Sequence, residues 1–257
     1  MRRLLIIGIG AGHPEQITQQ AVRALNQVDV FFVLDKGDVK DDLAQLRRDI
    51  CARYITRTDY RMLEVQDPVR DPTVASYSER VEAWHAERAI IFERLIAGEL
   101  SDEATGAILV WGDPALYDST LRIVERVIAR GQVAFEYSVV PGVSSVQALA
   151  ASHKIALNKI GGAVHITTGR KLAEAVAQQR LNEQDNVVVM LDGECAFATI
   201  EPEGVEIFWG AYVGSEHELL IAGALPEVAS EIVRVRAEAR ARHGWIMDVY
   251  LLRRLAT

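Results

Sequence analysis

The chain has 257 residues, of which 49% are apolar and 25% are charged, as is usual for a soluble globular protein. Its 28 basic and 36 acidic side chains give a formal net charge of −8 without a long Lys/Arg run. This balance argues against nucleic-acid binding, because phosphate contacts need clustered positive charge. The apolar stretch from Leu4 to Ala11 is far too short to cross a bilayer, so we expect no membrane segment.

Only two cysteines occur, Cys51 and Cys195, and neither has a His/Cys cluster near it in the sequence. This excludes a disulfide framework and a zinc site, so we expect no metal. Arg2 and Arg3 precede the first apolar run, but glycines interrupt that run and no A-x-A cleavage site follows. A buried first strand is therefore favoured over a signal peptide, and we expect a cytoplasmic protein.

Strand and helix patterns alternate along the whole chain. In the first half we expect strands at Leu4–Ile7, Val28–Leu34 and Ala107–Trp111, and helices at Thr18–Gln27, Asp41–Tyr54 and Ala75–Gly98. In the second half we expect helices at Ser119–Arg130, Ser145–Ser152 and Glu227–His243, and strands at Phe135–Val140, Val164–Thr168, Val187–Leu191, Ile207–Val213 and Val249–Leu252. Such alternation predicts an α/β protein with mostly parallel sheets. The number of strands favours two α/β domains, at residues 1–116 and 117–257.

Three glycines, Gly8, Gly10 and Gly12, lie between the first strand and the first helix. The dinucleotide fingerprint is G-x-G-x-x-G, and here His13 occupies the place of the third glycine. This spacing argues against a pyrophosphate cradle. It leaves open whether the tight turn binds a ligand through its backbone N–H groups or only joins strand to helix.

Asp35 ends the second strand, at the edge of the sheet where ligands bind in open α/β folds. In an NAD-dependent enzyme it would hold a ribose hydroxyl, and in another enzyme it would act as a general base. The structural alternative is a solvated turn residue.

Two further turns follow apolar strands. Gly112-Asp113-Pro114 lies at the inferred domain junction, so its backbone is expected to line an interdomain cleft, which is a favoured place for a cofactor. In PGVSS, Ser144 or Ser145 is expected to cap the following helix. Because G-x-S-x-G is absent, this segment does not predict a hydrolase nucleophile.

Three arginines in or near irregular segments, Arg57, Arg61 and Arg170, are candidate ligands for a polyanionic small molecule. Guanidinium groups bind carboxylates in bidentate fashion, which suits such a substrate. The alternative is that these side chains are solvated surface charges.

Five segments occur in a fixed order over nearly the whole chain: GIGAGHPEQIT, GDPALY, PGVSS, VVVMLDG and EHELLIAGAL. Together they resemble the tetrapyrrole (precorrin) methylase family. The resemblance implies a two-domain α/β enzyme that uses S-adenosylmethionine, releases S-adenosylhomocysteine and binds its cofactor between the domains. It also implies a homodimer.

The resemblance further implies which residues contact the cofactor, largely through backbone groups: Ala11, Trp111, Gly112, Asp113, Leu116, Ser144, Ser145, Met190 and Val213. The segment Tyr212-Val213-Gly214 departs from the Arg-Ala-Ser that the family often has, so Val213 is the contact to which the pattern lends least support.

Within the family, FFVLDKG, DPVRDP, VWGDPALYDSTLRI and LNKIGGAVHITTGR resemble the subgroup that methylates ring carbon 1 of precorrin-5 in cobalamin biosynthesis. The implied reaction loses acetic acid and gives precorrin-6A. Asp35 is then expected to assist proton removal or acyl loss, and Arg57, Arg61 and Arg170 to hold the substrate carboxylates. The alternatives are a family member that acts at another ring carbon, an NAD-dependent oxidoreductase, and a tetrapyrrole-binding protein without activity.

Overall fold

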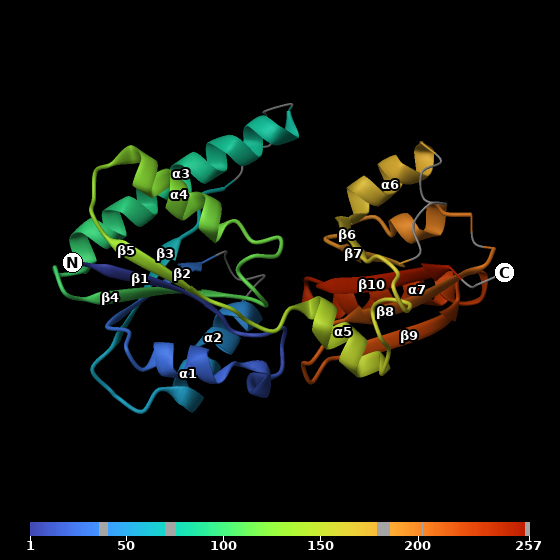
Figure 1. Ribbon diagram of the computed structural model, residues 1–257, viewed down its shortest axis with the longest axis horizontal. Helices are drawn as coiled ribbons and strands as arrows, with labels where there is room; N and C mark the ends of the chain where they lie inside the picture. The colour runs from blue at the N-terminus through green and yellow to red at the C-terminus, as the bar shows by residue number, and fades with distance from the viewer. Residues whose placement is uncertain (36–40, 70–75, 179–185, 202, 255–257) are drawn as a thin grey trace. The chain divides into compact units, whose positions relative to one another are not determined.

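The computed structural model describes residues 1–35, 41–69, 76–178, 186–201 and 203–254, and its contacts divide the chain into two compact units (Figure 1). Unit 1 comprises Met1–Gly10 and Pro14–Ser144, and unit 2 comprises Ala11–His13 and Ser145–Thr257. Each unit is built on its own five-stranded sheet.

The sheet of unit 1 is parallel throughout, with strand order β3-β2-β4-β1-β5. Its strands are β1 (Arg3–Gly8), β2 (Val30–Asp35), β3 (Arg61–Gln66), β4 (Thr105–Val110) and β5 (Glu136–Val140). All six residues of β4 are buried, because the sheet carries helices on both faces. Such strands read as continuous apolar runs, which is why β1, β2 and β4 were recognisable in the sequence.

Two pairs of helices cover the two faces of this sheet, with α1 and α2 on one side and α3 and α4 on the other (Figure 1). Their bounds are α1 (Gln19–Leu25), α2 (Asp41–Tyr54), α3 (Tyr77–Glu99) and α4 (Thr120–Arg130), and a 3-10 turn, η1 (Pro14–Gln16), precedes α1. α1 begins where Thr18 Oγ1 accepts the N–H of Ala21 at 3.0 Å. α4 ends at Gly131, whose φ of +65° is the left-handed conformation that commonly terminates helices.

The sheet of unit 2 is mixed, with strand order β6-β7-β10-β8-β9. Its strands are β6 (His165–Thr168), β7 (Asn186–Met190), β8 (Val205–Ala211), β9 (Leu219–Ala224) and β10 (Asp248–Arg254). β6 and β7 pair in parallel, whereas β10 is antiparallel to β7 and β8, and β9 is antiparallel to β8. Its helices are α5 (Ser145–His153), α6 (Gly169–Ala177), η4 (Ala196–Thr199) and α7 (Leu225–His243).

The core of unit 2 lies on one face of its sheet, where α6, η4 and α7 pack on the inward side chains of the strands. Trp209 and Tyr250 are completely buried there, and the Phe197 and Tyr250 rings meet edge to face with centroids 5.2 Å apart. α5 lies on the other face, where the ring of His153 contacts that of Phe208 at 5.6 Å.

The division into two α/β units confirms the expected fold class, but the domain boundary differs from the predicted one between residues 116 and 117. β5 pairs with β1, so α4 and β5 belong to unit 1 and the chain passes to unit 2 after Ser144. Parallel pairing holds for unit 1 and for β6 with β7, and the other pairs of unit 2 are antiparallel. β3, β9 and α6 had not been predicted, because β3 is polar, β9 is only partly buried and α6 is short.

Among the described residues, no helix is long and apolar enough to cross a membrane. Within the same ranges, no group of three or more His, Cys, Asp or Glu side chains is placed to hold a metal ion.

Candidate functional site

The carboxyl ends of the unit 1 strands lie along one edge of the sheet, because all five strands run in the same direction. Gly8, Asp35, Val110 and Val140 end β1, β2, β4 and β5 there. We call this edge, with the turns that follow the strands, the carboxyl edge of unit 1. Ligands bind at this edge in open parallel sheets. It carries five of the predicted cofactor contacts: Trp111, Gly112, Asp113, Leu116 and Ser144.

Glycines let the turns of this edge approach each other at backbone distance. A Cβ atom at Gly142 would lie 2.0 Å from the carbonyl oxygen of Gly112, and one at Gly8 would lie 2.6 Å from the nitrogen of Gly142. Gly10 and Gly112 exchange backbone hydrogen bonds, with Gly112 N donating to Gly10 O at 2.8 Å. Gly8 and Gly10 therefore serve the packing of three turns, which accounts for glycines that do not match the dinucleotide fingerprint.

Asp113 braces the same turns through its carboxylate. Oδ1 accepts the N–H of Ala115 at 2.8 Å, and Oδ2 accepts the N–H of Gly142 at 2.9 Å. Gly112 has φ +69°, and among the described residues other than its chain neighbours, Ser144 Cα at 3.6 Å is the one atom within 4 Å of a Cβ built there. The backbone of this turn is thus fixed by Asp113 and open beside Gly112, which suits a ligand recognised through main-chain groups.

A buried arginine of α3 joins the end of β3 to the start of α4. The Arg88 guanidinium forms a two-pronged ion pair with Asp67, in which Nε donates to Oδ1 at 2.6 Å, and Nη1 donates to Ser119 Oγ at 3.3 Å. The ring of Trp84 stacks on the same guanidinium, 3.7 Å from its Cζ. These residues were not among the predicted site residues, although Asp67 opens the DPVRDP segment that carried part of the resemblance.

A second arginine that was not among the predicted site residues is Arg47 of α2. Its Nε donates to the carbonyl oxygen of Leu109 at 3.3 Å, close to the end of β4. Burial lowers the pKa of its guanidinium, and the charge of Asp118 partly opposes that shift. A cation therefore lies beside the carboxyl edge of unit 1.

Arg57 and Arg61 lie at the opposite edge of this sheet. Arg61 is the first residue of β3, and it pairs with Glu99 at 3.3 Å. Arg57 pairs with Asp29 at 3.0 Å and with Asp59 at 2.6 Å. Their placement at the amino ends of the strands does not support the prediction that they bind the substrate.

The carboxyl ends of β6, β7 and β8 share one edge of the unit 2 sheet, because β7 and β8 both run antiparallel to β10. Thr168 pairs with Met190, and Met190 pairs with Val249. We call this edge, with the turns after these strands, the carboxyl edge of unit 2. It brings together Arg170, Met190 and Val213, which follow or end three different strands.

The turn after β8 is held by side chains rather than by glycines alone. Tyr212 has φ +50°, and its hydroxyl donates to the carbonyl oxygen of Trp245 at 2.5 Å. Glu218 Oε2 accepts the N–H of Gly214 at 2.7 Å. Gly12 packs against this turn, since a Cβ there would lie 2.7 Å from the carbonyl oxygen of Val213. Ala11, the neighbour of Gly12, is buried, so the structure brings two predicted cofactor contacts, Ala11 and Val213, into one region of unit 2.

The other predicted residues are placed as follows. Ser144 is buried and Ser145 is the first residue of α5, as the sequence suggested for a helix start. Asp35 ends β2 and pairs with Gln66 of β3, but its side chain lies outside the described part of the structure. Its expected role therefore remains a prediction.

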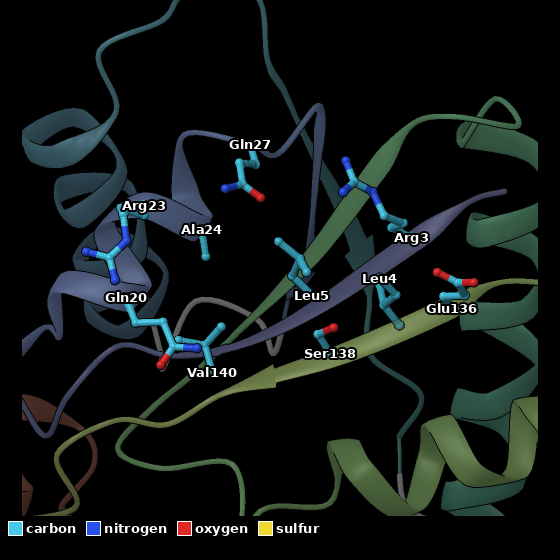
Figure 2. A pocket seen from close by; sticks show the side chains of 10 residues that line it. All are labelled: Arg3, Leu4, Leu5, Gln20, Arg23, Ala24, Gln27, Glu136, Ser138 and Val140. Atoms are coloured by element: carbon cyan, nitrogen blue, oxygen red, sulfur yellow. The ribbon is translucent and has the colours of Figure 1, made fainter.

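A pocket of about 280 Å³ opens beside α1 and the first half of β1 (Figure 2). Arg3, Arg23 and Glu136 are among the residues that line it, together with Leu4 and Leu5. Except for Val140, which ends β5, its lining lies away from the carboxyl edge of unit 1, so this pocket does not locate the predicted site.

Comparisons with known proteins agree on one family. Residues 3–229 match the family model of the tetrapyrrole (corrin/porphyrin) methylases. A precorrin-6A synthase (deacetylating) from a Sinorhizobium species is 55% identical over 254 residues, which cover 99% of this chain and 96% of the relative. A precorrin-2 C(20)-methyltransferase from a Sinorhizobium species is 25% identical over 194 residues, 74% of each chain.

Solved structures show the same fold. A putative cobalamin synthesis related protein (CobF) from Corynebacterium diphtheriae has a TM-score of 0.84, 39% identity and full coverage of both chains. A uroporphyrin-III C-methyltransferase from Thermus thermophilus, solved in complex with S-adenosylhomocysteine, has a TM-score of 0.60 and 18% identity, over 97% of this chain and 91% of that one. At that identity the second likeness concerns the fold alone.

Proposed function

This chain belongs to the tetrapyrrole (corrin/porphyrin) methylase family, and on that premise we propose that it methylates ring carbon 1 of precorrin-5. The methyl group comes from S-adenosylmethionine, and the product is precorrin-6A. The two-carbon acyl unit of the substrate leaves as acetic acid, a step that consumes one water molecule. The enzyme is thus a methyltransferase of cobalamin biosynthesis.

The observation that carries this proposal is the 55% identity to a precorrin-6A synthase over almost the entire length of both chains. The precorrin-2 C(20)-methyltransferase is only 25% identical over a shorter span, which disfavours that ring carbon. A dinucleotide enzyme is disfavoured by the glycines themselves, because Gly8 and Gly142 are needed for contacts between turns.

The chemistry supplied by S-adenosylmethionine is an electrophilic methyl group on a sulfonium centre. In unit 1, the open backbone beside Gly112 and the turn braced by Asp113 fit a ligand that is held by main-chain groups. We assign cofactor contacts to nine residues: Trp111, Gly112, Asp113, Leu116 and Ser144 at the carboxyl edge of unit 1, Met190 and Val213 at the carboxyl edge of unit 2, and Ala11 and Ser145 elsewhere in unit 2. A fixed backbone lowers the entropy that must be lost when ligand and protein are aligned for transfer.

Calorimetric titration with S-adenosylhomocysteine tests the cofactor class, with NAD in a parallel cell. We expect micromolar binding of S-adenosylhomocysteine and no heat from NAD. Binding of NAD instead of the homocysteine compound would overturn the assignment to the methyltransferases.

Product analysis tests the reaction. Incubation of the chain with precorrin-5 and S-adenosylmethionine should release one acetate for each methyl transferred, as followed by proton NMR. Methylation without acetate would indicate a family member that acts at another ring carbon. Substrate binding without turnover would indicate the non-catalytic alternative.

For the substrate we propose Arg170, which follows β6 at the carboxyl edge of unit 2 and forms an exposed pair with Glu174 at 3.2 Å. The exposure of this pair supports the proposal, because a surface ion pair contributes little to stability and a guanidinium binds a carboxylate well. Arg170→Ala should raise KM for the tetrapyrrole several-fold. Arg61→Ala, at the amino ends of the unit 1 strands, should leave this KM unchanged. Equal effects of the two substitutions would count against Arg170.

For proton transfer we propose Asp35, because it ends β2 at the carboxyl edge of unit 1. Asp35→Asn should lower kcat by about 10²-fold or more, which is the usual contribution of a general base, and should leave the affinity for S-adenosylhomocysteine unchanged. Full turnover by this variant would remove Asp35 from the mechanism.

We also propose a homodimer, on the ground of the family resemblance. β5 is one of the two edge strands of the unit 1 sheet, and Tyr137 and Val139 on it are 42% and 39% exposed. An exposed apolar edge strand is open to pairing with another chain. Light scattering should give twice the mass of the chain, and Val139→Lys should shift the protein toward monomer.

A further inference from the structure

The turn that follows Met190 adopts a conformation that its own sequence does not favour. Leu191 has φ +53° and Cys195 has φ +58°, both in the left-handed region that non-glycine residues seldom adopt. The side chain of Leu191 is 64% exposed, directly after the strand that ends in Met190. Contacts from elsewhere in unit 2 must therefore hold this turn.

The carboxylate of Asp192 supplies the contacts within the turn, although it is only 5% exposed. Oδ1 accepts the N–H of Glu194 at 3.1 Å, and Oδ2 accepts the N–H of Ala196 at 2.7 Å. The hydroxyl of Tyr250, on β10, donates to the same Oδ2 at 2.6 Å. Burial is the main cause that raises the pKa of Tyr250 far above its ordinary value, so the hydroxyl keeps the proton that it donates.

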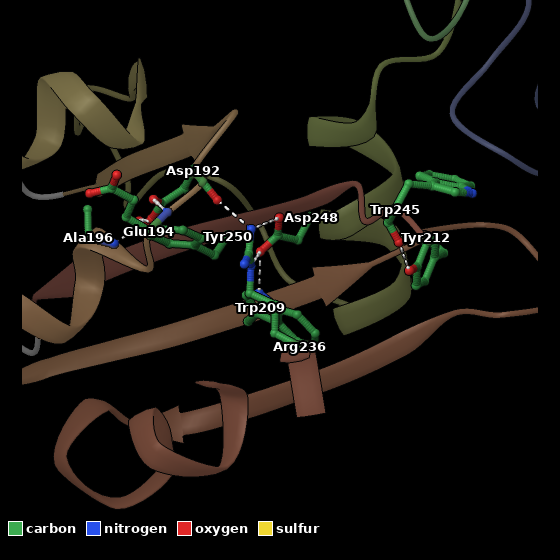
Figure 3. Close-up of polar contacts among 9 residues, drawn as sticks. All are labelled: Asp192, Glu194, Ala196, Trp209, Tyr212, Arg236, Trp245, Asp248 and Tyr250. Atoms are coloured by element: carbon green, nitrogen blue, oxygen red, sulfur yellow. Dashed lines mark hydrogen bonds and ion pairs between the residues drawn. The ribbon is translucent and has the colours of Figure 1, made fainter. Parts of the chain in front are cut away.

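Arg236 of α7 connects the turn to the rest of the sheet edge (Figure 3). Its Nη2 donates to the carbonyl oxygen of Asp192 at 2.7 Å, and its Nε donates to Asp248 Oδ2 at 2.8 Å. Trp209 Nε1 donates to the same oxygen of Asp248 at 3.0 Å. We call these five residues the Asp192 network: Asp192, Trp209, Arg236, Asp248 and Tyr250.

The start of α6 is fitted to the same carboxylate. A Cβ atom at Gly169 would lie 2.4 Å from Asp192 Oδ1, so only glycine leaves room for Asp192 there. Thr168, the residue before Gly169, pairs with Met190 across the sheet. One buried carboxylate thus sets the positions of the two turns that carry Met190 and Arg170.

We propose that Asp192, held by Tyr250 and Arg236, is a positioning residue that fixes the backbone of Met190 and Leu191 for the adenosine part of S-adenosylmethionine. This inference rests on the proposed function, which assigns Met190 to the cofactor. The network lies within unit 2 and its buried groups are engaged with one another, so it acts through the turn and not by touching the ligand. A turn that is ordered before binding loses little entropy when the ligand arrives, so the network should govern affinity more than the chemical step.

Tyr250→Phe tests this role, because it removes one hydroxyl from the network and leaves the ring in the core. Val205→Ala is the matched control, since Val205 is a buried residue at the far end of β8 from the carboxyl edge. In calorimetric titration of the full chain with S-adenosylhomocysteine, we expect Tyr250→Phe to weaken binding about tenfold. Val205→Ala should lower Tm at least as much and leave the affinity unchanged.

Steady-state kinetics separate positioning from general damage. Tyr250→Phe should raise KM for S-adenosylmethionine about tenfold and leave kcat at saturating cofactor within twofold of the wild type. Hydrogen exchange of the peptide that contains residues 190–197 should become faster in this variant and return to the wild-type rate at saturating S-adenosylhomocysteine. If Tyr250→Phe does not fold, Trp209→Phe, which removes the donor to Asp248, should show the same pattern with a smaller change.

The outcomes distinguish this inference from the proposed function. If the wild type does not bind S-adenosylhomocysteine, the proposed function fails. If the wild type binds and Tyr250→Phe binds equally well, or if Val205→Ala weakens binding to the same extent at equal Tm, the positioning role is overturned and the methyltransferase assignment stands.

Discussion

The two carboxyl edges of this protein are built in different ways. In unit 1, the turns after three parallel strands touch backbone to backbone, and the glycines Gly8 and Gly142 permit the approach. In unit 2, the turns after β7 and β8 contain non-glycine residues with positive φ, and the carboxylates of Asp192 and Glu218 hold their backbone N–H groups.

This difference teaches which part of a site can be seen in a sequence. A backbone contact at 2.0–2.9 Å from a would-be Cβ admits only glycine, so the edge of unit 1 is visible in the sequence as Gly8 after the first strand and Gly142 in PGV. A carboxylate that braces a turn leaves no such spacing, and Asp192 is itself held by Tyr250 and Arg236, which come from a distant strand and a distant helix. The carboxyl edge of unit 2 therefore depends on side-chain contacts that only the fold brings together.

Gly142→Ala should produce the largest effect, because the new methyl group would lie 2.0 Å from the carbonyl oxygen of Gly112. Neither neighbour is a flexible side chain, so the turns must separate. We expect a loss of more than about 4 kcal/mol in the stability of unit 1, together with loss of S-adenosylhomocysteine binding. Hydrogen-exchange mass spectrometry, read separately for peptides of each unit, measures the loss of stability in unit 1. Wild-type protection in unit 1 would show that the backbone contact is not required.

Arg236→Met should destabilise the carboxyl edge of unit 2, because it leaves the buried carboxylate of Asp248 without its cation. The expected loss is about 3–5 kcal/mol at pH 8, measured by urea unfolding. The double variant Arg236→Met/Asp248→Asn should recover a large part of this loss, because the amide is neutral and its oxygen still accepts from Trp209. An additive double variant would mean that the pair is not coupled.

The same variant has a pH dependence of known sign. Burial raises the pKa of Asp248, and Arg236 is the strongest opposing influence, so removal of Arg236 should raise that pKa further. In the folded variant Asp248 then keeps a proton that it releases in the unfolded chain. The loss of stability caused by Arg236→Met therefore becomes smaller as pH falls toward the pKa of Asp248 in the folded state. Arg236→Met should accordingly be closer in stability to the wild type at pH 5 than at pH 8.

Each unit contains one cysteine, and Cys51 in the core of unit 1 should make that unit sensitive to alkali. Burial raises the pKa of its thiol from 9.0 to about 12. The unfolded chain ionises first, so the stability of unit 1 should be complete below pH 9 and fall by about 1.4 kcal/mol per pH unit between pH 9 and 12. Comparison with Cys51→Ala at pH 8 and pH 10 isolates this contribution from other titrations. Identical pH slopes for the two proteins would refute it.

Gly98→Ala should give the smallest effect and the opposite sign to Gly142→Ala. Gly98 is exposed near the end of α3, and a Cβ there would have no atom of the described residues within 4 Å beyond its chain neighbours and its own helix backbone. Alanine in a helix is favoured over glycine by about 0.5–1 kcal/mol, so the variant should be slightly more stable by urea unfolding. If Gly98→Ala is less stable than the wild type, the space available for a Cβ does not by itself explain the difference between Gly98→Ala and Gly142→Ala.

Most elements of the fold could be predicted from the sequence where burial imposed a pattern. β1, β4 and β7 are nearly continuous apolar runs, and α2 was predicted with its observed bounds. β3 could not be predicted in this way, because it is an edge strand with polar residues and little burial. The boundary after Ser144 was not predicted, because it depends on the pairing of β5 with β1, which are far apart in the sequence. Local sequence patterns do not show which strands pair.

The sequence by itself determined the fold class through its burial patterns, and the glycine turns of unit 1 through contacts that admit no other residue type. Its motifs resembled the family that the comparisons then showed. Tertiary structure alone decided that Arg57 and Arg61 lie at the amino edge of their sheet while Arg170 and Met190 share the carboxyl edge of unit 2. It alone also joined Asp192 to Tyr250 and Arg236, which are 58 and 44 residues away along the chain. Strand direction and long-range hydrogen bonds fix such positions, and neither leaves a mark in the spacing of residues.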